Sequence, residues 1–181
     1  MTTVPAVAAP RAEGLSLRPF LPQDAPALLD IHRDPTLRRY IRNQVTDLDE
    51  AAGWLETQDR GRAEGSRYSF AVLERGVLVA NVVLKRGAPG SAGSEVGYWT
   101  AAAARGRGVA PRALAALTGW AWETFAADGL VRLDLFHEGD NAASCRVAEK
   151  AGYPLEALVP AAPPQYPLDG HWHSRPAGAA G

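Results

Sequence analysis

The chain of 181 residues contains a single cysteine, Cys145. One cysteine forms no internal disulfide and excludes the paired C-x-x-C spacing of zinc fingers and ribbons. A chain without disulfides suits a reducing compartment, so we expect a cytoplasmic location. Near the start, no basic segment precedes a continuous apolar run, so we expect no signal peptide. No apolar run reaches transmembrane length, so we expect no membrane partner.

The sequence also lacks an excess of charge of either sign. Nineteen Lys and Arg residues stand against 20 Asp and Glu residues, and the formal net charge is -1. Such a chain has no general basic field, so we expect no nucleic-acid partner. The hydrophobic fraction is 46% and the charged fraction 22%, values close to those of globular proteins with a packed core.

Length and composition also predict the domain organisation. A chain of this length forms one domain with a sizeable core. We expect a flexible N-terminal tail over residues 1–14, one domain over residues 15–174, and a flexible C-terminal tail over residues 175–181, where Pro, Ala and Gly dominate.

The periodicity of apolar residues predicts alternating strands and helices. Strands are expected at residues 15–20, 67–73, 77–84, 95–100, 131–136 and 154–159, and helices at residues 27–32, 47–60, 109–126 and 142–150. Residues 34–45 remain undecided. Three consecutive strands over residues 67–100 predict antiparallel pairing, whereas the helix between the next two strands predicts a parallel pair. The expected fold class is α/β, with a mixed sheet in an α+β arrangement.

A glycine-rich turn, Arg-Gly-Arg-Gly-Val-Ala, occupies residues 105–110 between a predicted strand and a predicted helix. Gly106 and Gly108 have no side chain to keep a phosphate from the backbone, and a helix start offers free N–H groups. Arg105 and Arg107 add positive charge. The Walker and dinucleotide-binding patterns do not fit this segment. By itself the turn is equally compatible with an ordinary strand-to-helix connection.

The histidines do not form a convincing set of metal ligands in the sequence. His171 and His173 could approach one ion from a single strand, but no third ligand is evident and His32 and His137 lie elsewhere. Cys145 has no paired histidine, so we interpret it as a small buried residue and not a nucleophile. We therefore expect no metal.

Four segments together resemble the GNAT superfamily of N-acetyltransferases. The turn at residues 105–110 resembles the signature R/Q-x-x-G-x-G/A, whose amides bind the pyrophosphate of coenzyme A. Residues 141–153, NAASCRVAEKAGY, resemble the N-x-x-S-x-x-x-x-E-K-x-G-[FY] segment of the branch that includes ribosomal-protein alanine N-acetyltransferases. Leu-Arg-Pro at residues 17–19 and Glu-Val-Gly-Tyr-Trp at residues 95–99 are similar to two further segments of that branch. All four occur in family order over residues 15–158.

The resemblance implies the GNAT acyl-CoA-binding fold, a mostly antiparallel sheet with flanking helices and one parallel strand pair that splays apart. It also implies an N-acetyltransferase that moves acetyl from acetyl-CoA, used as a co-substrate, to a primary amine by direct attack in a ternary complex. The acceptor class is a small molecule or a protein N-terminus. A homodimer is one of the oligomeric states left open.

The resemblance also implies site residues. Glu95 begins the strand that holds the thioester in the family and is our candidate base, although an exposed strand-end carboxylate is equally compatible. Ser144 matches a serine that can protonate the departing sulfur, although it can also simply occupy a first helical turn. The expected cofactor-binding residues are Trp99, Thr100, Arg105, Gly106, Arg107, Gly108, Val109, Ala110 and Asn141, of which Asn141 can also act as a helix cap.

The chain departs from the family pattern near its C-terminus. Residues 170–174, Gly-His-Trp-His-Ser, lead directly into a Pro, Ala and Gly segment, so we expect the family's last strand to be short or missing. A missing strand would leave the acceptor pocket incomplete and would favour a second hypothesis, a non-catalytic CoA-binding or interaction domain. The retained glycine turn, Glu95, Asn141 and Ser144 favour the catalytic hypothesis.

Overall fold

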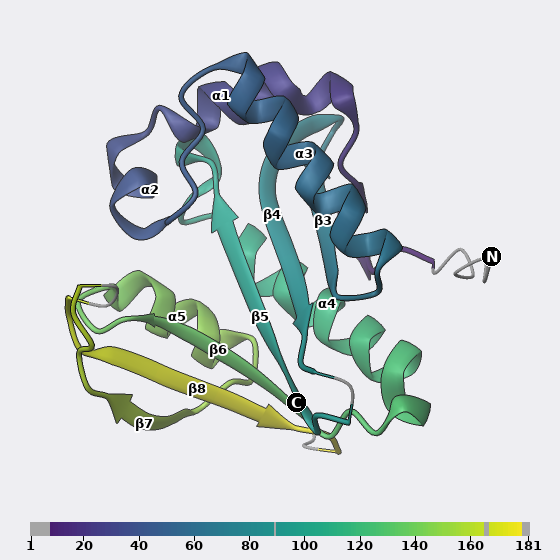
Figure 1. The fold of residues 1–181 in the computed structure, drawn as a ribbon, viewed down its shortest axis with the longest axis vertical. Helices are drawn as coiled ribbons and strands as arrows, with labels where there is room; N and C mark the ends of the chain where they lie inside the picture. Colours follow the sequence, from purple (N-terminus) through teal and green to yellow (C-terminus); the bar gives the residue numbers. More distant parts are fainter. Residues whose placement is uncertain (1–7, 89, 165–166, 179–181) are drawn as a thin grey trace.

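The computed structural model describes residues 8–88, 90–164 and 167–178 (Figure 1). Its strands are β1 (Arg11–Ala12), β2 (Leu15–Pro19), β3 (Arg67–Glu74), β4 (Val77–Arg86), β5 (Gly93–Thr100), β6 (Arg132–Glu138), β7 (Leu155–Val159) and β8 (Gly170–Pro176). Its α-helices are α1 (Ala25–His32), α2 (Pro35–Tyr40), α3 (Leu48–Ala63), α4 (Val109–Phe125) and α5 (Ala142–Lys150). The predicted elements are thus present, with ends that shift by a few residues.

The strands form one sheet in the order β1-β2-β3-β4-β5-β6-β8-β7. The pair β5 and β6 is parallel, and the other neighbours are antiparallel. The helix α4 connects β5 to β6, and a crossover of this kind returns the chain in the same direction. The predicted mixed sheet with one parallel pair is therefore confirmed.

Helices cover both faces of the sheet (Figure 1). On one face, α1 and α3 pack over a core that includes Phe20, Leu28 and Trp99. On the other, α4 and α5 cover a larger core that includes Leu117 and Tyr153. Each face therefore has its own apolar layer, and the sheet lies between them.

Side-chain caps explain where two of the helices begin. The Asp47 carboxylate accepts the N–H of Glu50 at 2.8 Å and starts α3, as the sequence predicts. The Asp34 carboxylate accepts the N–H groups of Thr36 and Leu37 and starts α2. This second cap accounts for the helix at residues 35–40, within the segment that periodicity left undecided.

The parallel strands separate part of the way along their length. Pairing runs from Gly93 with Arg132 to Val96 with Leu135, whereas β5 continues to pair with β4 as far as Thr100. Beyond Val96, the edge of β5 that faces β6 therefore has no strand partner among the described residues. Figure 1 shows the two strands diverging from their shared end.

The predicted N-terminal tail is wrong for the part that the structure describes. Strand β1 pairs with β2, and the indole N–H of Trp120 donates to the carbonyl of Ala8. Local composition could not reveal the second contact, because it joins residues 112 positions apart. Residues 1–7 of the predicted tail lie outside the described residues.

The expectation of a short or missing last strand is also wrong. Strand β8 spans seven residues, Gly170–Pro176, and inserts between β6 and β7. The predicted tail from residue 175 therefore starts too early, since Arg175 pairs with Leu133 and the N–H of Ala177 donates to the carbonyl of Val131 at 2.8 Å. Residues 179–181 of that tail lie outside the described residues.

Candidate active site

The glycine turn lies between the end of β5 and the start of α4. Gly106 has φ 73° and Gly108 has φ 72°, a left-handed conformation that strains any residue with a Cβ. Gly108 is the N-cap residue of α4. A Cβ built on either glycine would meet no heavy atom within 4 Å, so the backbone of the turn faces open space.

The turn presents unused hydrogen-bond donors. Among the described residues, the N–H groups of residues 106–110 donate to no backbone carbonyl. The helix α4 follows directly with 17 residues, and its dipole places partial positive charge at this end. Free N–H groups at a helix start form an anion site. Five residues of the predicted turn, 106–110, thus have free N–H groups at the start of α4, whereas the N–H of Arg105 donates to the carbonyl of Ala102.

The two arginines of the turn form ion pairs with other segments. Arg105 pairs with Asp34, the cap of α2, and Arg107 pairs with Glu74. Burial opposes ionisation of Asp34, but the hydrogen bond from Arg105 and those from N–H groups hold the pKa of Asp34 below its ordinary value. Sequence reasoning missed Asp34, because its partner lies 71 residues away.

A pair of hydroxyl groups lies on the α5 side of β5. The hydroxyl of Tyr98 lies 2.8 Å from Oγ of Ser144, and the Ser144 side chain is buried. Burial raises the pKa of Tyr98, although its hydrogen bond to Ser144 opposes the rise. The Asn141 side chain accepts the N–H of Ser144 at 3.1 Å and caps α5. Sequence reasoning did not single out Tyr98 within the segment at residues 95–99.

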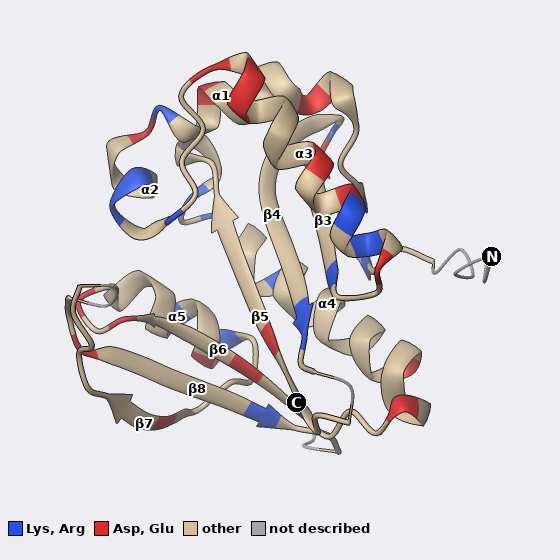
Figure 2. Ribbon diagram, viewed as in Figure 1, with Lys and Arg blue, Asp and Glu red and all other residues tan. Residues whose placement is uncertain are grey.

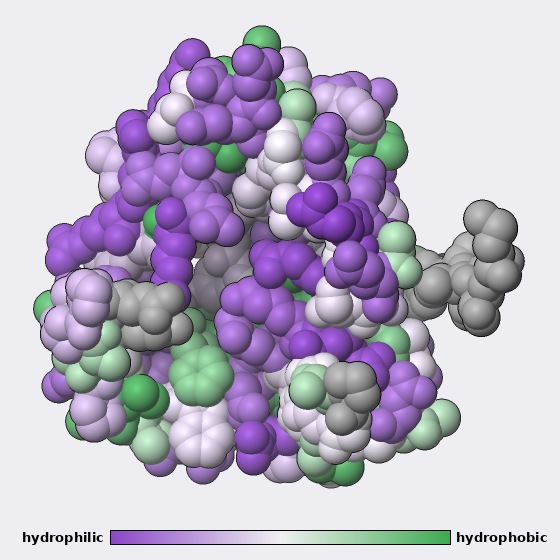
Figure 3. All heavy atoms as spheres, in the orientation of Figure 1, coloured by the Kyte–Doolittle hydropathy of each residue, from purple (hydrophilic) through white to green (hydrophobic). Residues whose placement is uncertain are grey.

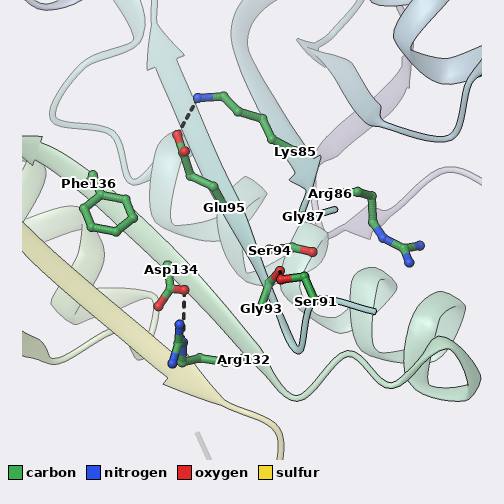
Figure 4. Close-up of a pocket in the computed structure, with 10 residues that line it drawn as sticks. All are labelled: Lys85, Arg86, Gly87, Ser91, Gly93, Ser94, Glu95, Arg132, Asp134 and Phe136. Carbon is green, nitrogen blue, oxygen red and sulfur yellow. Dashed lines mark hydrogen bonds and ion pairs between the residues drawn. The ribbon is translucent and has the colours of Figure 1, made fainter. Parts of the chain in front are cut away.

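Glu95 lies on the opposite face of the sheet from Tyr98. The two are three residues apart on one strand, and side chains alternate between faces. Glu95 pairs with Lys85 and stands in register with Asp134 of β6, which pairs with Arg132. Figure 4 shows both pairs around a pocket of about 260 Å³. The two predicted catalytic side chains therefore lie on either side of the sheet.

Two predicted cofactor residues at the end of β5 are mostly buried. The indole of Trp99 packs against Phe20 and edge-on against His32, at centroid distances of 6.4 and 5.7 Å. The hydroxyl of Thr100 is buried and has no hydrogen-bond partner in the described part of the chain. A cofactor contact at Trp99 would therefore use its backbone and not its ring.

The structure corrects the interpretation of the histidines. His137, Cys145, His171 and His173 converge, and their potential ligand atoms all lie within 4.8 Å of one another. The sequence missed this set because the residues belong to β6, α5 and β8, whose packing no spacing rule predicts. His32 lies apart, at the C-terminal end of α1, where burial lowers its pKa to about 4.

The helices of the described residues include none with the length and apolar character needed to cross a membrane. The predicted cytoplasmic location stays a prediction.

Comparison with known families places the site in context. A family model described as an acetyltransferase (GNAT) domain matches residues 15–154. A search of curated proteins gave no match. The fold agrees with many solved structures. One is a putative ribosomal-protein-serine acetyltransferase from Vibrio cholerae, with 23% identity and a TM-score of 0.82 over 93% of this chain and 97% of that one.

Two further structures are of proteins named RimL and RimJ. RimL, an alpha-N-protein acetyltransferase in complex with coenzyme A, has 20% identity and a TM-score of 0.82 over 95% of this chain and 99% of that one. RimJ from Mycobacterium smegmatis, in complex with CoA-disulfide, has 20% identity and a TM-score of 0.78 over 94% and 87%. The TM-scores show a common fold, and at these identities they show the fold alone.

The fold and the splayed strand pair define an acetyltransferase of the GNAT class. The chain belongs to the GNAT acetyltransferase family, whose domain model covers it from the start of β2 to the residue before β7, and by enzyme class it is an N-acetyltransferase. The predicted family is therefore confirmed.

Proposed function

We propose that this protein transfers an acetyl group from acetyl-CoA to a primary amine on a peptide N-terminus. The observation that carries the proposal is the glycine turn, where unused N–H groups of residues 106–110 meet the positive end of α4. In the proposal the pyrophosphate of CoA binds there. Arg105 and Arg107, which pair with Asp34 and Glu74 in this structure, lie beside it and can turn to the phosphates. Val109 and Ala110 contribute backbone N–H groups from the first turn of the helix.

The gap between β5 and β6 would hold the pantetheine arm. Backbone groups on the open edge of β5 beyond Val96 have no strand partner among the described residues, and an extended chain with amide groups can pair with such an edge. The backbone of Trp99 and Thr100 lies along it, between the turn and the paired ends of the strands. Asn141 and Ser144 approach the same gap from α5 in this proposal.

The two sides of the sheet suit the two proton transfers. Attack on a thioester requires loss of a proton from the amine and protonation of the departing sulfur. We assign the first transfer to Glu95, acting directly or through water, on the face that carries the pocket. We assign the second to Ser144 on the other face, with Tyr98 hydrogen-bonded to it at 2.8 Å. Tyr98 would then return a proton to Ser144.

In this proposal the acceptor amine enters through the polar pocket beside Glu95. The lining carries both signs of charge, since the carboxylates of Glu95 and Asp134 pair with Lys85 and Arg132 (Figure 4). Figure 2 shows acidic positions on the adjacent strands β5 and β6. The surface of this face is largely hydrophilic and is hollowed between the α1–α3 half and the β6–β8 half (Figure 3). An open polar surface of this kind accommodates a peptide end. The names of the RimL and Vibrio cholerae proteins support the same acceptor class.

The hypothesis of a non-catalytic domain depended on a short or missing last strand, which would leave the acceptor pocket incomplete. Because β8 is a full strand of seven residues, that reason no longer applies. We propose one acyltransferase domain that includes β1 through β8, working in the cytoplasm. A homodimer remains one possible oligomeric state, and the mass of the protein in solution distinguishes it from a monomer.

The test is a thiol-release assay with acetyl-CoA and a panel of acceptors. Peptides that begin with Ser or Ala should release CoA at rates well above buffer, and the same peptides with a blocked N-terminus should not. Aminoglycosides and free amino acids form the comparison set. If only small amines cause release of CoA, the acceptor is a small molecule and not a peptide. If no amine causes release of CoA, the proposed activity is wrong.

A further inference from the structure

Three histidines and the only cysteine of the chain meet between β6, β8 and α5. Sγ of Cys145 lies 3.1 Å from Nδ1 of His171 and 3.5 Å from Nε2 of His137. Nε2 of His137 lies 3.1 Å from Nε2 of His173. The His173 side chain is fully buried, and the other three are partly buried. The cluster lies beneath the first turn of α5 and uses none of the acidic residues of the pocket.

Backbone carbonyls fix the ring protons of two histidines. Nδ1 of His137 lies 2.8 Å from the carbonyl oxygen of Glu138, and Nδ1 of His173 lies 3.0 Å from that of Tyr153. A carbonyl oxygen only accepts, so each Nδ1 carries the proton and each neutral ring has a bare lone pair on Nε2. These two lone pairs face each other at 3.1 Å. A cation bound by both would turn this repulsion into attraction.

A metal ion accounts for the whole cluster better than a shared proton. A proton could join only the two facing nitrogens, whereas the cluster also places Sγ of Cys145 and Nδ1 of His171 within 4.8 Å of both. Histidines that bind metals usually donate their other ring N–H to a carbonyl or carboxylate. His137 and His173 already have this arrangement.

The distances and atom types suit zinc. Bonds of about 2.0–2.1 Å to nitrogen and about 2.3 Å to sulfur put neighbouring ligand atoms of a tetrahedron roughly 3.3–3.6 Å apart. Three of the ligand-atom pairs lie 3.1–3.5 Å apart, close to this spacing. The remaining pairs lie within 4.8 Å, so zinc binding would draw their side chains closer together. Imidazole and thiolate ligands favour zinc over Mg²⁺ or Ca²⁺, which prefer oxygen. Four protein ligands fill the tetrahedron, as in structural sites.

We propose that His137, Cys145, His171 and His173 bind one Zn²⁺ ion, which fastens the first turn of α5 to β6 and β8. Binding forms a zinc–sulfur bond at Cys145 and releases the thiol proton to solvent. The turn that the ion holds also carries Ser144, whose Oγ contacts Tyr98. The inference is independent of the proposed acetyl transfer, because metal binding is measured directly.

The test uses the full chain after treatment with a chelator, titrated with Co²⁺ as a spectroscopic substitute for zinc. We expect one Co²⁺ per chain, a sulfur-to-cobalt charge-transfer band in the near ultraviolet, and the strong visible bands of a tetrahedral ion. Added Zn²⁺ should remove these bands and raise the thermal midpoint. A folded wild-type chain that binds no Co²⁺ stoichiometrically, or binds it without the sulfur band, overturns the proposal.

Two variants sharpen the result. Cys145→Ser should lose the sulfur band and weaken Zn²⁺ binding by at least about tenfold, since even outer partners of zinc ligands contribute that much. His32→Asn is the matched control, because it removes the one histidine outside the cluster, and it should bind metal like the wild type. Equal Zn²⁺ affinity of Cys145→Ser and wild type would also overturn the proposal. The wild-type titration decides the matter even if a variant fails to fold.

Discussion

The hydroxyl of Tyr98 in β5 lies 2.8 Å from Oγ of Ser144 in α5, although the two residues are 46 positions apart. This contact joins the strand expected to hold the thioester to the helix expected to protonate its sulfur. A thiolate is a tolerable leaving group, so Ser144→Ala should lower kcat only about tenfold to a hundredfold, with CoA affinity nearly unchanged. If Tyr98 acts through Ser144, the double variant with Tyr98→Phe should lose little more activity. Fully additive losses would separate their roles.

Glu95 should govern the activity at low pH. Glu95→Gln removes the proposed base, so kcat/KM should fall by about a hundredfold or more where the amine is protonated. The rate should recover in part as rising pH deprotonates the amine without help. Lys85→Gln serves as control, because it removes the ion-pair partner and keeps the carboxylate. An unaltered pH–rate profile in Glu95→Gln would assign the base elsewhere.

His32 should make the fold sensitive to mild acid. Burial and the nearby Arg38 lower its pKa from 6.5 to about 4, so the unfolded chain binds this proton more readily than the folded one. The contribution of neutral His32 to the free energy of unfolding is complete above about pH 6.5 and is lost as the pH falls toward 4. At pH 4 the loss amounts to roughly 3 kcal/mol. His32→Asn, whose side-chain oxygen can still accept the N–H of Val45, should flatten this slope. Urea titrations across the interval measure it, and parallel slopes in both proteins would contradict the assignment.

The end of the fold should lie between Ser174 and Gly178. Truncation after Ser174 removes the hydrogen bond from Arg175 to the carbonyl of Ala151 and that from Ala177 to Val131. At about 1 kcal/mol each, with the lost strand pairing, this should lower the thermal midpoint by roughly 5–10 °C. Truncation after Gly178 removes only residues 179–181 and should leave it unchanged. Equal midpoints for the two truncations would show that the last residues of β8 add no stability.

The sequence predicted most elements of the fold because their signals are local. Asp47 is followed by helical spacing, and the alternation from Tyr68 to Val72 needs no distant partner. The prediction of a short or missing last strand was wrong for the opposite reason. Histidines, a proline and an arginine give β8 no strand signal of their own, and only pairing with β6 makes it a strand.

The same distinction applies to the site. The glycine turn is contiguous, so its residues could be named from the sequence. Tyr98 with Ser144, Arg105 with Asp34, and the cluster around Cys145 each join segments that meet only after folding. The residue types alone do not indicate which residues come into contact, so no spacing rule could pair them.

Calorimetry of CoA binding to Gly108→Val tests the central claim most directly. A branched side chain at φ 72° both strains the turn and fills the open space over its N–H groups. Gly76→Val is the matched control, since Gly76 also has a positive φ and open space but lies in the turn between β3 and β4. We predict that CoA affinity falls at least about tenfold in folded Gly108→Val, the loss of one charge-assisted hydrogen bond or more, and stays at the wild-type value in Gly76→Val. Wild-type CoA affinity in folded Gly108→Val would contradict the placement of the pyrophosphate over this turn.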